Sequence, residues 1–250
     1  GFVTPLDLVR PSGGTVQPSG INDAGIVSVN VGSDAYLYSG GQFRPLVHLN
    51  PFNQRSLVRA LNNAGVAVGN SRVDGGRAHA ALFREGETVD LGTLGGEESD
   101  ATDINNSGVV VGWSQVPGGA RAFRWRADTG LEALPGVDGR PISQAWAIND
   151  AGVIAGLWAD FNGGSGLLLW RPEGVVEMGR LDIGETRPLG INASNQVVGV
   201  SGGRAFLWQN NRLQDLKELI PQDSPWVLLS AQAINDAGQI IGFGRIGGEG

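Results

Sequence analysis

Short apolar segments alternate with Asn, Asp and Gly along the whole chain. In the clearest example, Ala147-Ile148 precedes the polar pair Asn149-Asp150, and Val153-Ile154-Ala155 follows Gly152. Asn and Gly placed between β-branched residues are typical of a tight turn that joins two antiparallel strands. The pattern therefore predicts a β-hairpin, with Gly152 at a positive φ angle.

The same hairpin pattern occurs six times. Its turns lie at Ile21–Gly25, Leu61–Gly65, Ile104–Gly108, Ile148–Gly152, Ile191–Asn195 and Ile234–Gly238. Successive turn asparagines are 40 to 44 residues apart. A period of about 40–45 residues with several short strands per unit is typical of a β-propeller blade. Helical repeats of this length would need long stretches with a 3.6-residue period, which the chain lacks.

Each unit can be divided into four predicted strands. In the third unit these are Asp100–Ile104, Val109–Trp113, Arg121–Arg126 and Leu131–Leu134. The third strand of a unit carries a large aromatic residue near its end, namely Tyr38, Phe83, Trp125, Trp170 or Trp208. We expect these rings to pack between neighbouring twisted sheets, because they bury a large apolar area.

These motifs resemble the HAF repeat, a family of mainly bacterial repeat proteins. The resemblance rests on the Ile-Asn-Asp-Ala-Gly turns, on the segment from His79 to Phe83 and on the segment from Asp90 to Gly96. Only one unit contains the histidine of the family name, and the fifth turn ends in Asn195 where the others have Gly. The resemblance implies a secreted or cell-surface location and supplies no catalytic residues.

We therefore predict an all-β fold, a six-bladed β-propeller of four-stranded blades that forms one domain over residues 1–250. The sixth unit has two predicted strands, Ser230–Ile234 and Gln239–Phe243, before the sequence ends. Because open sheet edges favour aggregation, N-terminal residues are expected to complete this last blade. Leu6-Asp7-Leu8 is the best candidate strand, and Phe2-Val3 is a second, less clear one.

The amino-acid composition argues against several classes of function. The net charge is −7, and 17 of the 18 basic residues are arginines that form no cluster, so nucleic acid is not an expected partner. The chain has no cysteine and only two histidines, His48 and His79, so neither a metal site nor a Ser-His-Asp triad is expected. No apolar run approaches the roughly 20 residues of a membrane span. We expect no cofactor.

Binding residues are expected where the scaffold varies. The hairpin turns are short and uniform, whereas the segments that cross between units, on the opposite face, vary in length and composition. This crossover face is the predicted binding face. Its candidate residues are Arg55, Arg140, Trp146, Trp158, Asp160, Arg187 and Trp226. Aromatic rings beside arginines suit a sugar or an acidic polymer.

The leading functional hypothesis is an extracellular or cell-surface binding or structural module without enzymatic activity. Its partner would be a polysaccharide or another surface protein. One alternative is a hydrolase or lyase that acts on an extracellular polymer, with paired carboxylates such as Glu97 and Asp160. A second alternative is a subunit that self-associates through the abbreviated last blade.

Overall fold

The computed structural model describes residues 15–247, of which most form short β-strands. Strands follow one another in antiparallel meanders, and each meander corresponds to one sequence repeat, here called units 1 to 6. The all-β prediction is thereby confirmed. Two short 3-10 turns, Asp74–Gly76 (η1) and Leu216–Leu219 (η2), are the helical segments of this part of the chain.

Units 1 to 5 each contribute four strands. Unit 1 contains β1 (Val16–Ile21), β2 (Val27–Val31), β3 (Asp34–Ser39) and β4 (Gln42–Pro45). Unit 2 contains β5 (Ser56–Leu61), β6 (Ala67–Arg72), β7 (Ala78–Arg84) and β8 (Glu87–Gly92). Unit 3 contains β9 (Ser99–Ile104), β10 (Val110–Val116), β11 (Gly119–Arg126) and β12 (Gly130–Ala133). Unit 4 contains β13 (Ile142–Ile148), β14 (Ile154–Ala159), β15 (Ser165–Arg171) and β16 (Gly174–Gly179). Unit 5 contains β17 (Thr186–Ile191), β18 (Val197–Ser201), β19 (Arg204–Gln209) and β20 (Arg212–Asp215).

The sheets differ from the predicted set of six four-stranded blades. Units 3 and 4 merge into one eight-stranded sheet, because Ala120 of β11 pairs with Ile142 of β13 in parallel. Unit 6 has only β21 (Trp226–Ile234) and β22 (Ile240–Ile246) among the described residues. No pairing within residues 15–247 joins unit 6 to unit 1, so the described sheets do not close into a ring. The proposed closing residues Leu6–Leu8 and Phe2–Val3 lie outside the described residues.

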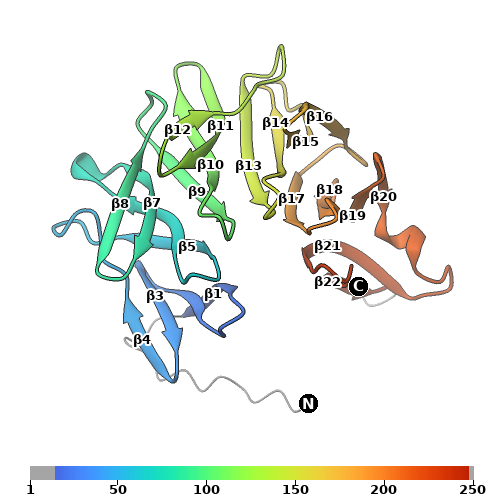
Figure 1. Ribbon diagram of the computed structural model, residues 1–250. Coiled ribbons are helices and arrows are strands. Elements are labelled where there is room, and N and C mark those ends of the chain that lie inside the picture. The colour runs from blue at the N-terminus through green and yellow to red at the C-terminus, as the bar shows by residue number, and fades with distance from the viewer. Residues whose placement is uncertain (1–14, 248–250) are drawn as a thin grey trace.

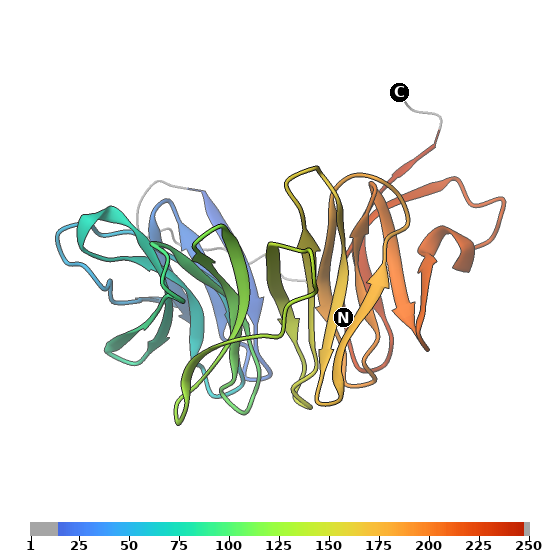
Figure 2. The ribbon, with the colours of Figure 1, turned by 90° about the horizontal axis from the view of Figure 1, so that it is seen from above.

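The units are arranged in an arc around a common centre. Figure 1 shows the sheets fanned out in sequence order, with units 1 and 6 at the two ends of the arc. The first strands of neighbouring units contact one another, as β5 does with β1 and β9, so they form the inner side of the arc. In the side view of Figure 2 the units stand next to one another, with their strands running across the thickness of the molecule.

The hydrophobic core lies between neighbouring units. Five separate buried clusters join unit 1 to 2, 2 to 3, 3 to 4, 4 to 5 and 5 to 6. Phe83, Trp170 and Trp208, three of the predicted packing aromatics, are each at most 3% exposed in these clusters or beside them. Each sheet is therefore stabilised mainly by the apolar faces of its neighbours, as expected for a stacked repeat.

Each first strand carries a β-bulge at the same position. The register shifts at Ser19, Arg59, Thr102, Trp146, Leu189 and Gln232. In units 2 to 6 the second strand places a glycine opposite this irregularity, at Gly69, Gly112, Gly156, Gly199 and Gly242. A Cβ atom at any of these glycines would overlap a backbone carbonyl oxygen of the first strand. Close approach of two backbones therefore requires glycine here.

The hairpin turns have the glycine conformation that the sequence predicts. Gly152 has φ of 79°, and the equivalent Gly25, Gly65, Gly108 and Gly238 also have positive φ, as expected. Asn195, which replaces glycine in the fifth turn, adopts φ of 60°. The leading asparagines such as Asn149, in contrast, are not among the described residues with positive φ. These asparagines stabilise the turns through the hydrogen bonds of their side chains.

Candidate functional site

The leading asparagine of each of the first five turns holds its own turn and also binds the next unit. In Asn105, for example, Oδ1 accepts hydrogen bonds from the backbone N–H groups of Ser107 (3.1 Å) and Val109 (2.9 Å). Its Nδ2 donates to the carbonyl oxygen of Asn149 in the next unit (3.1 Å). The same link, at 3.0 to 3.2 Å, joins Asn22 to Asn62, Asn62 to Asn105, Asn149 to Asn192 and Asn192 to Asn235.

This asparagine ladder holds the turns side by side on one face of the arc. We call this face the turn face, defined by the turns between first and second strands and between third and fourth strands. Beside the ladder, Asn106 donates its backbone N–H and its Nδ2 to Asp150 at 2.8 Å each. Asn63 and Asp23 are linked in a similar way at their exposed side chains. The turn face is thus a rigid, hydrogen-bonded surface.

Clefts lie on the turn face between neighbouring units. Among four such clefts, the one between units 2 and 3 has the largest volume, about 750 Å³, and reaches the first turn of unit 4. Others of about 250, 560 and 390 Å³ lie between units 1 and 2, 4 and 5, and 3 and 4. A volume of 750 Å³ falls within the range that binds small organic molecules. The sequence analysis expected binding on the opposite, crossover face.

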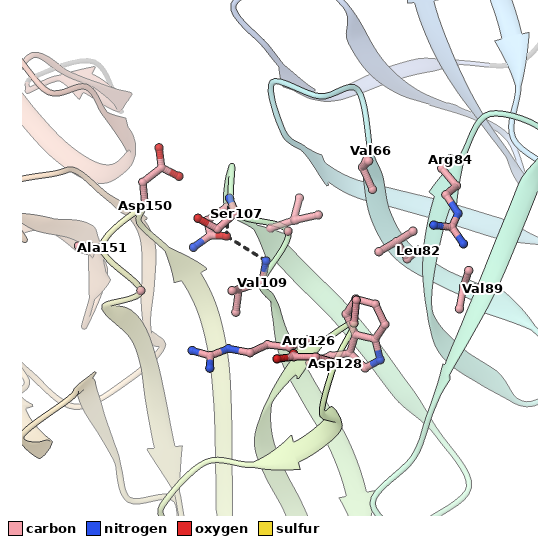
Figure 3. Close-up of a pocket in the computed structure, with 16 residues that line it drawn as sticks. Val66, Leu82, Arg84, Val89, Ser107, Val109, Arg126, Asp128, Asp150 and Ala151 are labelled. Atoms are coloured by element: carbon pink, nitrogen blue, oxygen red, sulfur yellow. Dashed lines mark hydrogen bonds between the residues drawn. The ribbon is translucent and has the colours of Figure 1, made fainter.

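The largest cleft has apolar walls and a polar rim (Figure 3). Val66, Leu82 and Val89 of unit 2 lie on one side, and Val109 lies at the middle, held by its hydrogen bond to Asn105. The half-buried indole of Trp125 also lines the cleft. Apolar and aromatic surface of this kind packs against the C–H face of a ring.

Two of the four charged side chains at the rim are already engaged. Arg84 donates Nε–H to Glu87 (2.8 Å), and the Asp150 carboxylate accepts both hydrogen bonds from Asn106. Arg126 and Asp128 also line the cleft, and within the described residues neither has a side-chain hydrogen bond or an ion pair. One donor group and one acceptor group are therefore available over an apolar floor, and the charges of the cleft balance. This combination suits a polyhydroxylated ligand, such as a sugar unit.

Four of the predicted crossover-face residues form two arginine–tryptophan stacks. The Cζ atom of Arg140 lies 3.6 Å from the centre of the Trp158 ring, and Asp160 lies 3.6 Å from Arg140 Nη1. The Cζ atom of Arg187 lies 4.9 Å from the Trp146 ring, and its Nη2 lies 2.9 Å from Glu185. Trp158 is only 8% exposed, because it packs in the core between units 3 and 4 and because Arg140 covers its ring. Cation–π contact of this kind stabilises the loop but occupies the ring face.

The remaining predicted residues come from other units. Arg55 is exposed just before β5 of unit 2, and Trp226, 46% exposed, begins β21 of unit 6. Glu97, expected to act with Asp160, is paired with Arg77 at 2.7 Å. His48 lies 3.4 Å from Asp34, and His79 lies 3.0 Å from Asp90. The structure therefore brings together one group of three predicted residues, Arg140, Trp158 and Asp160, and one pair, Arg187 and Trp146, rather than one cluster of seven.

Asp103 is a feature that the sequence analysis missed. It follows the bulge of unit 3, where the other units carry Gly20, Ala60, Ala147, Gly190 and Ala233. Its carboxylate accepts the backbone N–H groups of Ile148 (2.9 Å), in unit 4, and of Ile104 (2.8 Å). Burial, with a smaller contribution from the charge of Asp150, raises the pKa of Asp103 to about 7, against the lowering effect of the two N–H groups. Aligning the six units would have revealed this single carboxylate.

The raised pKa of Asp103 predicts a pH-dependent stability. Folded Asp103 keeps a proton that the unfolded chain releases above about pH 4, so its contribution to stability is lost as the pH rises from about 4 to about 7. We expect the stability of the parent relative to Asp103→Ala, measured as the difference in the free energy of unfolding, to be roughly 1–3 kcal/mol greater at pH 5 than at pH 8. Denaturant unfolding at both pH values measures this difference. An equal difference at the two pH values would contradict the raised pKa.

Neither a metal-binding cluster nor a membrane-spanning helix is found among the described residues. Within residues 15–247, no cluster of three or more His, Cys, Asp or Glu side chains is placed to hold a metal ion. The described residues also contain no helix with the length and apolar character needed to cross a membrane.

Comparison with known proteins identifies a similar fold but no function. No family model and no curated protein matches the chain, so the HAF-repeat resemblance stays a prediction. Among solved structures, a TolB-like protein from Agrobacterium tumefaciens matches with a TM-score of 0.66 and 14% identity, over 94% of this chain and 91% of that one. TolB from Acinetobacter baumannii matches with a TM-score of 0.56 and 14% identity, over 78% of this chain but only 51% of that one. The chain therefore has an all-β fold similar to that of TolB-type β-propellers, although its described sheets do not close into a ring.

Proposed function

We propose that the chain is a non-enzymatic, extracellular or cell-surface binding module, and that it binds a polysaccharide in the cleft between units 2 and 3. The observation that carries this proposal is the combination of an apolar cleft that contains the Trp125 ring with the unengaged Arg126 and Asp128 at its rim. A sugar ring presents a C–H face to apolar surface and hydroxyl groups to charged side chains. The volume of about 750 Å³ suits a ligand of one or two sugar units.

The turn face is preferred over the crossover face for a physical reason. At the crossover stacks, a ligand would have to displace Arg140 from Trp158, and Asp160 already neutralises that arginine. At the turn-face cleft, no such contact has to be broken at Arg126 or Asp128. The crossover-face residues Arg55, Arg140, Trp146, Trp158, Asp160, Arg187 and Trp226 stay a second candidate surface, with the exposed Trp226 ring as its most accessible part.

A glycan array followed by calorimetry tests the proposal. Arg126→Ala and Asp128→Ala should each lower the affinity for the best-bound glycan about tenfold or more, because each removes a charge-assisted hydrogen bond. The matched controls are Arg55→Ala and Asp223→Ala, which remove exposed side chains outside the cleft. They should leave the affinity unchanged. The opposite pattern would place binding on the crossover face, and bond cleavage in the bound glycan would favour the enzyme alternative.

We also propose that the complete chain closes into a six-bladed ring, with N-terminal residues completing the last unit. Asn235 is the last asparagine of the ladder. Among the described residues, its Nδ2 donates a hydrogen bond only to Gln239 of its own turn (2.7 Å), which leaves room for a further unit beside it. Ile241 and Phe243 on β22 are each 68% exposed, so an apolar surface is uncovered there. Deletion of residues 1–10 should broaden thermal unfolding and promote aggregation through the open edge. Unfolding identical to that of the parent would rule out this closure, whereas self-association of the intact chain would favour the assembly alternative.

A further inference from the structure

The turn-face clefts adjoin one another and share wall residues. Arg126 lines both the cleft between units 2 and 3 and the cleft between units 3 and 4. Arg171 and Pro172 line the latter and also the cleft between units 4 and 5. Ala151 lines all three. The three largest clefts therefore meet at shared walls, and the smallest adjoins the series through Val66 and Arg84.

Each cleft repeats the same kind of lining, because each is formed by the same parts of the repeat. An arginine follows the packing aromatic of the third strand, as Arg84, Arg126 and Arg171 do after Phe83, Trp125 and Trp170. The first-strand turn of a neighbouring unit forms another wall. Apolar surface completes each cleft, for example Leu134 and Pro135 in the second of the three and Val175 and Val176 in the third.

We propose that these clefts act as consecutive subsites of one groove, which binds a linear glycan chain along the turn face from unit 2 to unit 5. This inference rests on the function proposed above and specifies its ligand class as an extended polymer rather than a single sugar. Arg126 contacts the ligand at the junction of the first two subsites, and Arg171 does so at the junction of the second and third.

The groove favours a polymer because its recognition groups recur at intervals. The volumes of the three clefts, about 750, 390 and 560 Å³, together exceed what a single small ligand fills. The Cζ atom of Arg171 lies 5.3 Å from the centre of the Trp208 ring, and its Nε is buried. The guanidinium group is thereby held at the junction of the second and third clefts, and its Nη groups have no hydrogen-bond partner among the described residues. If the spacing of the sugar units matches the spacing of the clefts, each further subsite adds affinity. The loss of translational and rotational freedom is then incurred only once, for the first unit bound.

Calorimetric titration with a size series tests this inference. The probes are neutral β-1,4-linked gluco-oligosaccharides and oligogalacturonates, each from about two to about eight sugar units. For the parent protein, affinity should rise about tenfold or more between the shortest and the longest bound oligomers, because further subsites become occupied. Equal affinity for short and long oligomers would overturn the groove while leaving the single-cleft function intact. No binding of any glycan by the parent would overturn both.

One substitution separates the second subsite from the first. Ala133 is exposed on β12 and lines the cleft between units 3 and 4 but not the larger cleft, so Ala133→Trp fills only the second subsite. Because the second subsite is blocked, this variant should bind long oligosaccharides no more tightly than short ones. Glu173→Trp, on an exposed turn at the cleft between units 4 and 5, should reduce the gain only for the longest oligomers. An unaltered gain in both variants, at an unchanged melting temperature, would contradict the proposed path.

Discussion

Gly156→Ala should destabilise the protein by about 3–5 kcal/mol, a large effect for one added methyl group. Gly156 lies on β14 opposite the bulge of β13. A Cβ atom there would overlap the carbonyl oxygen of Gln144 and would lie 2.5 Å from Cζ3 of the buried Trp170 ring. Neither neighbour can retreat easily, because one is backbone and the other is 3% exposed in the core between units 3 and 4.

Thermal unfolding measures this effect, and Gly152→Ala is its matched control. For a chain of this length, 1 kcal/mol corresponds to roughly 2–4 °C in Tm, so Gly156→Ala should lower Tm by about 10 °C. Gly152, in the same hairpin, has positive φ but open space around its Cβ position. Alanine there should cost about 1–2 kcal/mol, from backbone strain alone. Similar Tm values for the two variants would show that β13 and β14 do not approach as closely as described.

The contrast between these two glycines shows what the sequence could and could not predict. Gly152 sits in an Asn-Asp-Ala-Gly segment, and such turn patterns have a local cause, so the hairpins and the repeat period were predictable. Gly156 looks like an ordinary residue in an apolar strand. Its role depends on a bulge in the paired strand, which is a non-local feature. Its recurrence at Gly69, Gly112, Gly199 and Gly242 was nevertheless a signal that could have been found.

The candidate site shows the same limit. The sequence analysis placed Trp158, Arg140 and Asp160 on one predicted binding face, and the structure places them in contact. It could not foresee that the arginine would cover the ring, because stacking depends on side-chain geometry. The largest cleft is formed by two units and the turn of a third, and uniform turns gave no reason to expect it. Clefts between repeats depend on how the repeats pack, which the sequence of one repeat does not specify.

Asn62→Ala should destabilise the protein by about 2–4 kcal/mol, because it breaks the ladder that links the units. Asn62 is 6% exposed, and its Oδ1 accepts from the backbone N–H groups of Ala64 (3.1 Å) and Val66 (3.0 Å). Its Nδ2 donates to the carbonyl oxygen of Asn105 in unit 3 (3.2 Å). Alanine leaves all three backbone groups without these partners, and a buried group without a partner costs about 1–3 kcal/mol.

Two further variants assign this loss to the ladder itself. Asn63→Ala removes the neighbouring side chain, whose bonds to Asp23 are exposed to water, and should cost less than about 1 kcal/mol. Asn62→Asp keeps the Oδ1 acceptor but turns a carboxylate oxygen toward the carbonyl oxygen of Asn105, so it should be nearly as harmful as alanine at pH 7. Below about pH 4 the protonated carboxyl group can donate that hydrogen bond again, and part of the stability should return relative to Asn62→Ala. Denaturant unfolding of the three variants at both pH values measures these differences. A deficit for Asn62→Asp that does not shrink in acid would show that the donor to Asn105 contributes little, and that Asn62 stabilises only its own turn.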